Sequence, residues 1–271
     1  MWGLFFAAVL AGAAFLYVPG MLVLLGFRVK APLAFAFAPL LGIPVTVALT
    51  IAYPLLGVNS NRASVFLPQL AVSLIVFAIG NRRGLCCGDG LVGDDCDSSV
   101  SDSKALLLYV AAGVAVSTVM FVTFLQDPMH YTQGYDNVTH LGSIRCFVDS
   151  GNWSPFSTSL YVNADAAINP LPGGGFYPAA WYDVASFVIS LLGVPVALSE
   201  NATNYIFVGL LYPVGMFAFM RVVFPDRREI LLWGAACVLA IAAFPWQTLA
   251  WGLCFPTLRR FACCRLFLRC S

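Results

Sequence analysis

The chain has 271 residues, of which 60% are hydrophobic and only 10% are charged. A soluble globular domain carries about 25% charged residues, so most of this surface must meet lipid rather than water. The formal net charge of +1 and the lack of a basic stripe with interleaved aromatic residues argue against nucleic acid as a partner.

Seven apolar segments are long enough to cross a bilayer, which takes about 20 apolar residues. They are expected at 2–26, 31–57, 64–80, 105–125, 176–198, 204–224 and 229–250. The second segment holds four prolines, which predict a kinked or interrupted helix. The sequence therefore predicts an all-α, polytopic transmembrane bundle of about seven spans, grouped in 1–125 and 176–252, with the lipid bilayer as its surroundings.

Basic residues in the short loops set the orientation, because such loops are enriched in Lys and Arg on the cytoplasmic side. Arg28 and Lys30 follow the first span, and Arg82, Arg83 and Lys104 flank the loop after the third. Both loops are therefore expected in the cytoplasm. The N-terminus and the loop 126–175 are then expected outside it.

Arg227 and Arg228 conflict with this orientation, because they follow the sixth predicted span and would also lie outside. Two explanations remain open. Either 176–198 does not fully cross the membrane, or the rule fails locally.

The segment 84–103 is polar and acidic, with glycines and serines between its aspartates. It lacks the spacing of a calcium loop and is expected to be a flexible cytoplasmic linker. The nine cysteines show no pair of pairs with zinc-site spacing. We expect no metal site and no cofactor.

The segment 136–150 predicts a short amphipathic helix on the extracytoplasmic membrane surface. At 100° per residue, an apolar side forms opposite a polar side. The apolar side holds Val138, Leu141, Ile144 and Val148, and the polar side holds Asp136, Thr139, His140 and Ser143. Arg145 and Asp149 lie one turn apart and can form an ion pair.

Asp136 and His140 are one helical turn apart on the polar side. A carboxylate there can act as a general base toward a hydroxyl, and the imidazole can bind that carboxylate or an anionic group. The alternative is that Asp136 only caps the helix N-terminus. The spacing alone leaves both open.

The following segment, 163–181, is rich in proline and glycine and ends in aromatic residues. Tyr177 and Trp181 mark a helix that enters at the lipid headgroup level. Asp183 lies just inside that span. A carboxylate within a membrane span points to function by default, although near the interface it can simply be hydrated.

Two sequence blocks resemble a known family. The first runs Gln133-Gly134-Tyr135-Asp136-Asn137-Val138-Thr139-His140-Leu141 and continues through Ile144-Arg145 to Asp149-Ser150-Gly151, and the second is Phe176-Tyr177-Pro178-Ala179-Ala180-Trp181. Together they are similar to a large, uncharacterised family of bacterial, mostly actinobacterial, polytopic membrane proteins. That family in turn resembles the GT-C glycosyltransferases. The resemblance extends from the first span through Phe255-Pro256 and implies a multi-pass protein of the bacterial plasma membrane.

The resemblance implies a transferase that moves a sugar from a polyprenyl-phosphate donor to an extracytoplasmic acceptor. Asp136 would be the catalytic base. Arg145 or His140 would contact the donor phosphate, and Tyr177 and Trp181 would stack on the sugar or the prenyl chain.

Three features depart from the family pattern. Tyr182 stands where the family usually has His, and Gly142 where it has Asn. Family members also continue with further spans, whereas residues 253–271 are rich in Arg and Cys. We expect this tail to reflect a shifted reading frame, which would make the chain a truncated fragment that need not be active. The rival interpretation is a basic cytoplasmic tail near anionic lipid.

The alternative function is a non-enzymatic membrane scaffold or cell-envelope assembly subunit. An ion-coupled transporter is disfavoured, because the sequence has no internal repeat and its predicted spans carry almost no charge.

Overall fold

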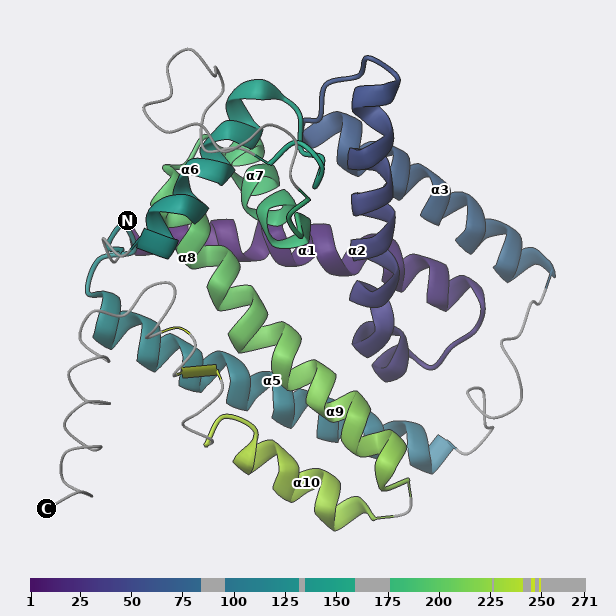
Figure 1. Ribbon diagram of the computed structural model, residues 1–271. Coiled ribbons are helices and arrows are strands. Elements are labelled where there is room, and N and C mark those ends of the chain that lie inside the picture. The colour runs from purple at the N-terminus through teal and green to yellow at the C-terminus, as the bar shows by residue number, and fades with distance from the viewer. Residues whose placement is uncertain are drawn as a thin grey trace, which may run out of the picture.

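The computed structural model describes residues 1–83, 96–131, 135–158, 176–225 and 227–240, together with 245, 246 and 249; the side chains of 96–101 and 135–136 lie outside the description. Every regular element in the five long ranges is helical, which confirms the all-α prediction (Figure 1). Five described helices are long and apolar enough to cross a membrane. This confirms the membrane class, whereas the expected count of about seven spans is not confirmed.

The N-terminal helices α1 (Trp2–Gly26), α2 (Ala31–Leu55) and α3 (Arg62–Arg83) pack backbone against backbone. A Cβ atom on Gly20 would lie 2.0 Å from the Ala38 carbonyl oxygen, and one on Gly80 would lie 2.1 Å from the Gly26 carbonyl oxygen. Real Cβ atoms do not approach that closely. Small residues at such crossings let membrane helices approach and gain van der Waals contact.

The second half contains α5 (Cys96–Leu125) and a long rod made of α8 (Val196–Ile206), a π-helical segment (Phe207–Leu211) and α9 (Tyr212–Val223). The rod forms one membrane-length span, Val196–Val223. Gly113 of α5 packs against the backbone of Gly209 in the π-helical segment. Helix α10 (Arg228–Cys237) lies against α5 and α9.

Helix α7 (Ala180–Leu192) corrects the predicted span 176–198, because it has only 13 residues. At 1.5 Å per residue it is about 20 Å long, short of the ~30 Å hydrocarbon core. Gly193, with a φ of 65°, ends it in the left-handed region, and the next span begins three residues later. The predicted boundary at 204 is therefore eight residues late. The last predicted span, 229–250, begins as α10 and runs beyond the described residues.

The predicted linker 84–103 is also corrected in part. Residues 84–95 lie outside the described part, but α5 already begins at Cys96. Asp102 is buried and pairs with Arg221 of α9, with 2.9 Å between the Asp102 Oδ1 and Arg221 Nε atoms. An acidic residue assigned to the linker thus ties two spans together.

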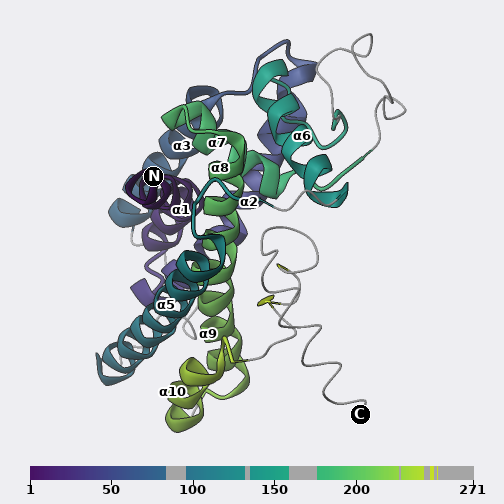
Figure 2. The ribbon, with the colours of Figure 1, turned by 90° about the vertical axis from the view of Figure 1, so that its left-hand side faces the viewer.

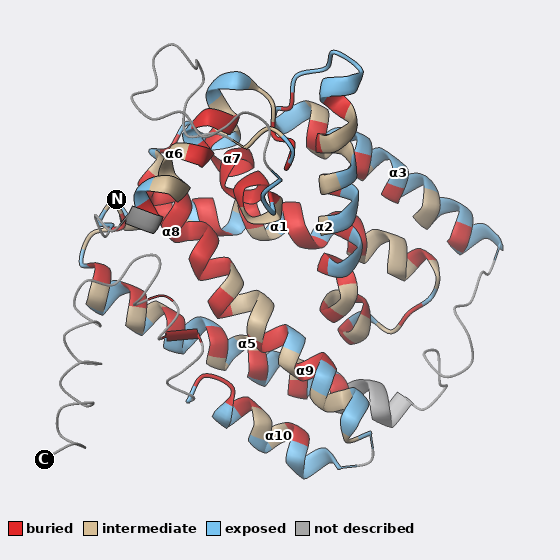
Figure 3. Cartoon of the chain, viewed as in Figure 1, coloured by how far each residue is buried: buried red, intermediate tan, exposed pale blue. Residues whose placement is uncertain are grey.

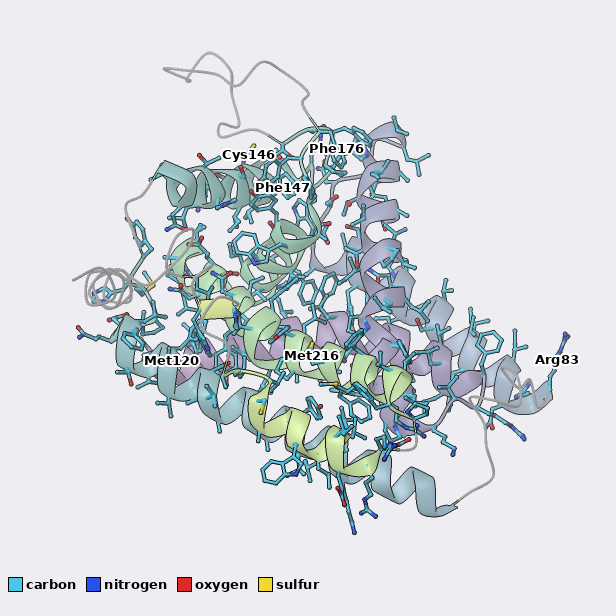
Figure 4. All side chains as sticks on the ribbon, turned by 60° about the horizontal axis from the view of Figure 1, so that its bottom comes forward. Arg83, Met120, Cys146, Phe147, Phe176 and Met216 are labelled. Atoms are coloured by element: carbon cyan, nitrogen blue, oxygen red, sulfur yellow. The ribbon has the colours of Figure 1, made fainter. Side chains whose placement is uncertain are left out.

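That ion pair also shows which ends of the spans lie on the same side of the molecule. It joins the start of α5 to the end of α9, and in Figure 1 the ends of α1 and α3 lie on the same right-hand side of the molecule. Figure 4 shows Arg83 at this side and Met120, near the other end of α5, on the opposite side. Because α7 is too short to cross, Arg227 and Arg228 fall beside the other basic loops rather than opposite them.

Helices α6 (Tyr135–Ser150) and α7 lie at the other end of the bundle, opposite α10 (Figure 2). The surface helix expected at 136–150 is therefore present as α6. Buried residues concentrate in α7 and α8, whereas α3 exposes much of its surface (Figure 3). Leu67, Val72 and Ile75 of α3 are exposed and suited to contact lipid.

Candidate functional site

The surface helix α6 packs on α7 and α8. Asn137, Ser143, Ile144 and Phe147 are buried, while Val138 is more than half exposed. We expected the apolar side to face lipid or the bundle and the polar side to lie opposite it. The buried residues come from both predicted sides, because Ile144 belongs to the apolar side and Ser143 to the polar side, so the inward face of α6 is mixed.

His140 makes the central contact of this interface. Its Nδ1 atom lies 2.5 Å from the hydroxyl oxygen of Tyr182 in the first turn of α7. His140 belongs to the first sequence block, and Tyr182 directly follows the second, 42 positions along the chain.

Four rings gather around this hydrogen bond. The His140 ring centroid lies 5.7 Å from that of Tyr182, 5.8 Å from that of Trp181 and 6.4 Å from that of Tyr177. Tyr182 also contacts the rings of Tyr177 and Trp181, at 5.7 and 5.3 Å. The structure thus brings together three of the four predicted substrate-binding residues: His140, Tyr177 and Trp181. We call these three residues and Tyr182 the aromatic cluster.

Local structure explains how the second sequence block supplies its rings. The Tyr177 amide donates a hydrogen bond to the Pro155 carbonyl oxygen, 2.9 Å away, which holds the approach to α7 against the segment after α6. Figure 4 shows Phe176 in this segment, near Cys146 and Phe147 of α6. Helix α7 begins at Ala180, so Trp181 and Tyr182 project from its first turn.

The cluster is anchored on one edge and open on another. The Trp181 indole Nε1 donates to the Asn204 Oδ1 atom of α8 at 3.2 Å. Tyr182 is buried, whereas Tyr177 is 46% exposed. A ligand can therefore reach the cluster from the Tyr177 edge.

The Tyr182 hydroxyl is buried among polar groups. Burial raises the pKa of this hydroxyl well above its usual range, and the neighbouring Tyr177 and Glu200 raise it further, against a smaller lowering by Ser143. The group therefore keeps its proton and can donate it in a hydrogen bond.

The predicted base, Asp136, lies in the first turn of α6, one turn before His140. Its side chain falls outside the described residues, so its contacts remain those that the sequence predicts.

Arg145 is the one predicted substrate-binding residue outside the aromatic cluster's contacts. Its Nε atom lies 2.6 Å from the Asp149 Oδ2 atom, which confirms the predicted pair, and its side chain is 63% exposed. To bind a phosphate, Arg145 would have to exchange this partner.

Two buried carboxyl groups lie behind the cluster, Asp183 on α7 and Glu200 on α8, and both are fully buried. Neither oxygen of Glu200 has a hydrogen-bond partner in the described part of the chain. Thr50 of α2 faces Asp183. Sequence reasoning flagged Asp183 but missed Glu200, because the predicted boundary put it in a loop between spans. The polar run Ser199–Asn204 before an apolar stretch was the signal.

One cavity lies away from the cluster. A cavity of about 140 Å³ lies between α1, α2 and α3, bordered by Pro19, Gly42 and Gln69 among others. Within the described ranges, no group of three or more His, Cys, Asp or Glu side chains is arranged to hold a metal ion.

Comparison with known proteins gives a family but no characterised relative. No curated protein and no solved structure matches the chain. A family model does match, over residues 13–268, which includes both sequence blocks and the aromatic cluster. The chain therefore belongs to a family of unknown function (DUF6541).

Proposed function

We propose that the protein is a membrane glycosyltransferase that takes a sugar from a polyprenyl-phosphate donor and attaches it to an acceptor outside the cytoplasm. The observation that carries the proposal is the aromatic cluster, which joins His140 of α6 to Tyr182, 42 positions away, and to Tyr177 and Trp181. Aromatic faces with a nearby hydrogen-bond donor suit a sugar that is linked to a phosphate.

We assign the reaction from this arrangement and from the role that the family resemblance implies for Asp136. The acceptor oxygen forms a bond to the anomeric carbon as the bond from that carbon to the lipid phosphate breaks, with inversion. The acceptor proton goes to the Asp136 carboxylate, and the electron pair leaves on the phosphate. His140 donates a hydrogen bond to that phosphate, where negative charge grows.

The location of the cluster supports a lipid-linked donor. It lies at the end of the bundle opposite the basic loops, beneath a surface helix and beside the start of a membrane span. By the orientation expected from those loops, this end is extracytoplasmic. A donor with its prenyl chain in the bilayer would present its sugar at this depth.

The test uses the full chain in nanodiscs with a radiolabelled polyprenyl-phosphate hexose. Trp181→Ala is expected to weaken donor binding roughly tenfold, since one aromatic contact is worth about 0.5–1.5 kcal/mol. Trp233→Ala is the matched control, because Trp233 lies on α10 and is 73% exposed. Equal affinities of the two variants would contradict the proposed site.

Transfer to an added acceptor tests the base separately. Asp136→Asn is expected to lower the transfer rate by about 10²–10⁴-fold while donor binding stays unchanged. Full transfer by this variant would remove the assignment. Failure of the wild-type chain to bind any polyprenyl-phosphate sugar, together with a stoichiometric protein partner, would favour the scaffold alternative.

A further inference from the structure

The cavity between α1, α2 and α3 lies at a depth where only lipid chains surround the protein. On α3 it is bordered by residues 68–73, well over a turn inside both ends of that helix (Arg62–Arg83). Lipid headgroups lie beyond the ends of a span, and hydrocarbon fills the ~30 Å between them. The volume of about 140 Å³ is close to the roughly 150 Å³ of an apolar cavity that stays dry and binds a small hydrocarbon.

The wall of the cavity suits hydrocarbon better than water. Among the described residues that line it, only Gln69 and Ser73 have polar side chains. The Gln69 amide nitrogen donates to the Thr46 Oγ1 atom at 3.0 Å and to the Val65 carbonyl oxygen at 2.9 Å, so both of its protons are used. The Gln69 Oε1 atom lies 3.3 Å from the same Thr46 hydroxyl. A buried water needs about two to four polar partners, and this wall offers too few.

The helices around the cavity cannot close on it. Gly20 and Gly42 both border the space, and at both positions α1 and α2 are already in backbone contact. A Cβ atom on Gly20 would meet the Ala38 carbonyl oxygen, and one on Gly42 would lie 2.8 Å from the Leu16 carbonyl oxygen. An empty space of this kind leaves the atoms of its wall without dispersion contacts. A molecule from outside can supply those contacts.

The cavity opens toward the bilayer. Val45 of α2 and Val72 of α3 border it and are 47% and 58% exposed, so the opening is continuous with the lipid-facing surface of α3. Leu41 and Val45 lie on one side of α2. Thr50, which faces Asp183 of α7, lies on another side. A lipid chain therefore enters the cavity from a different side than a ligand that approaches the aromatic cluster.

We propose that this cavity binds one acyl chain of a bilayer phospholipid, which enters between Val45 and Val72 and completes the packing of α1, α2 and α3. Membrane helices associate through van der Waals contact rather than through a hydrophobic driving force. The bound chain therefore stabilises the crossing of the three helices. The site does not depend on the proposed function and takes no part in sugar transfer.

Native mass spectrometry tests the site on the full chain, taken into detergent from vesicles of phosphatidylcholine with deuterated chains. The wild type is expected to retain one phospholipid. Ser73→Leu fills the cavity from its buried wall and is expected to lose that lipid. Ala78→Leu is the matched control, because it adds the same side chain at an exposed position of α3 that does not line the cavity. It is expected to retain the lipid.

Thermal unfolding separates lost binding from simple damage. Added phosphatidylcholine is expected to raise the Tm of the wild type and of Ala78→Leu. In Ser73→Leu, the side chain takes the place of the lipid, so the Tm without lipid is expected to be higher than that of the wild type and to stay unchanged when lipid is added. If this variant does not fold, Val45→Trp blocks the opening from its exposed rim and is expected to lose the lipid too.

Four results would overturn the proposal. A wild type without retained phospholipid, or equal retention in the wild type and in the variant that fills or blocks the cavity, would mean that no lipid binds there. Displacement of the phospholipid by an equal amount of polyprenyl phosphate would assign the cavity to a prenyl chain. A lipid-free dimer in the same spectra would assign it to a second copy of the chain. Sugar-donor binding at the aromatic cluster is measured separately, through Trp181→Ala, so each proposal can fail without the other.

Discussion

Two regions of the bundle are built on different principles. In α1, α2 and α3, glycines bring backbones into direct contact, as at Gly20 against Ala38. Around α6, α7 and α8, buried polar groups such as Glu200 and Asp183 have few hydrogen-bond partners among the described residues. Close packing stabilises the first region, whereas the second keeps costly groups buried. Such groups mark functional sites in membrane proteins.

The largest expected effect is on the glycine crossings. Gly20→Leu would place side-chain atoms in the Ala38 backbone, which cannot move aside as a flexible side chain can. We expect loss of most folded protein, measured as the monodisperse fraction in detergent. Gly215→Leu is the control, because nothing lies within 4 Å of a Cβ at Gly215. Equal loss in both variants would show that the crossing is not tightly packed.

The second prediction concerns the side of the membrane on which α7 ends. Since α7 is too short to cross, Leu192→Cys in a cysteine-free background should react with an impermeant maleimide from outside the cell. Asn59→Cys, in the loop before α3, should behave alike, and Arg227→Cys should be protected. Protection at position 192 would mean that α7 crosses after all.

The third prediction concerns the buried Asp102–Arg221 ion pair. Arg221→Met leaves the buried Asp102 without its partner, so we expect a loss of about 1–3 kcal/mol. A steric-trap or denaturant titration in detergent measures it. The double variant Arg221→Met/Asp102→Leu should recover part of the loss, because the isolated buried charge is then gone. No recovery would mean that the pair itself, and not the stranded charge, supplies the stability.

The smallest effect is expected at the surface pair of α6. Arg145→Ala breaks an ion pair whose partners are both substantially exposed, so the stability should change by less than about 1 kcal/mol. Donor binding in the same variant tests the predicted phosphate contact separately. Weaker binding without a change in stability would show that Arg145 exchanges Asp149 for the ligand.

Much of the site could be predicted from spacing within one segment. The 3.6-residue period located α6 and put Asp136 and His140 on one side, and the one-turn spacing predicted the pair of Arg145 with Asp149. Which side of α6 faces inward was a different matter, because it depends on Tyr182 from a distant segment. The burial of Glu200 could not be read locally either, since it follows from where α8 begins.

Composition and periodicity by themselves determined that this chain is an all-helical membrane protein with a short surface helix, because apolar length and amphipathic spacing are local properties. The family resemblance likewise rested on residues close together in sequence. Only the tertiary structure decided that α7 stops short, that Asp102 pairs with Arg221, and that Tyr182 contacts His140. Those facts depend on pairings between helices far apart in the chain, and no local pattern encodes the partner.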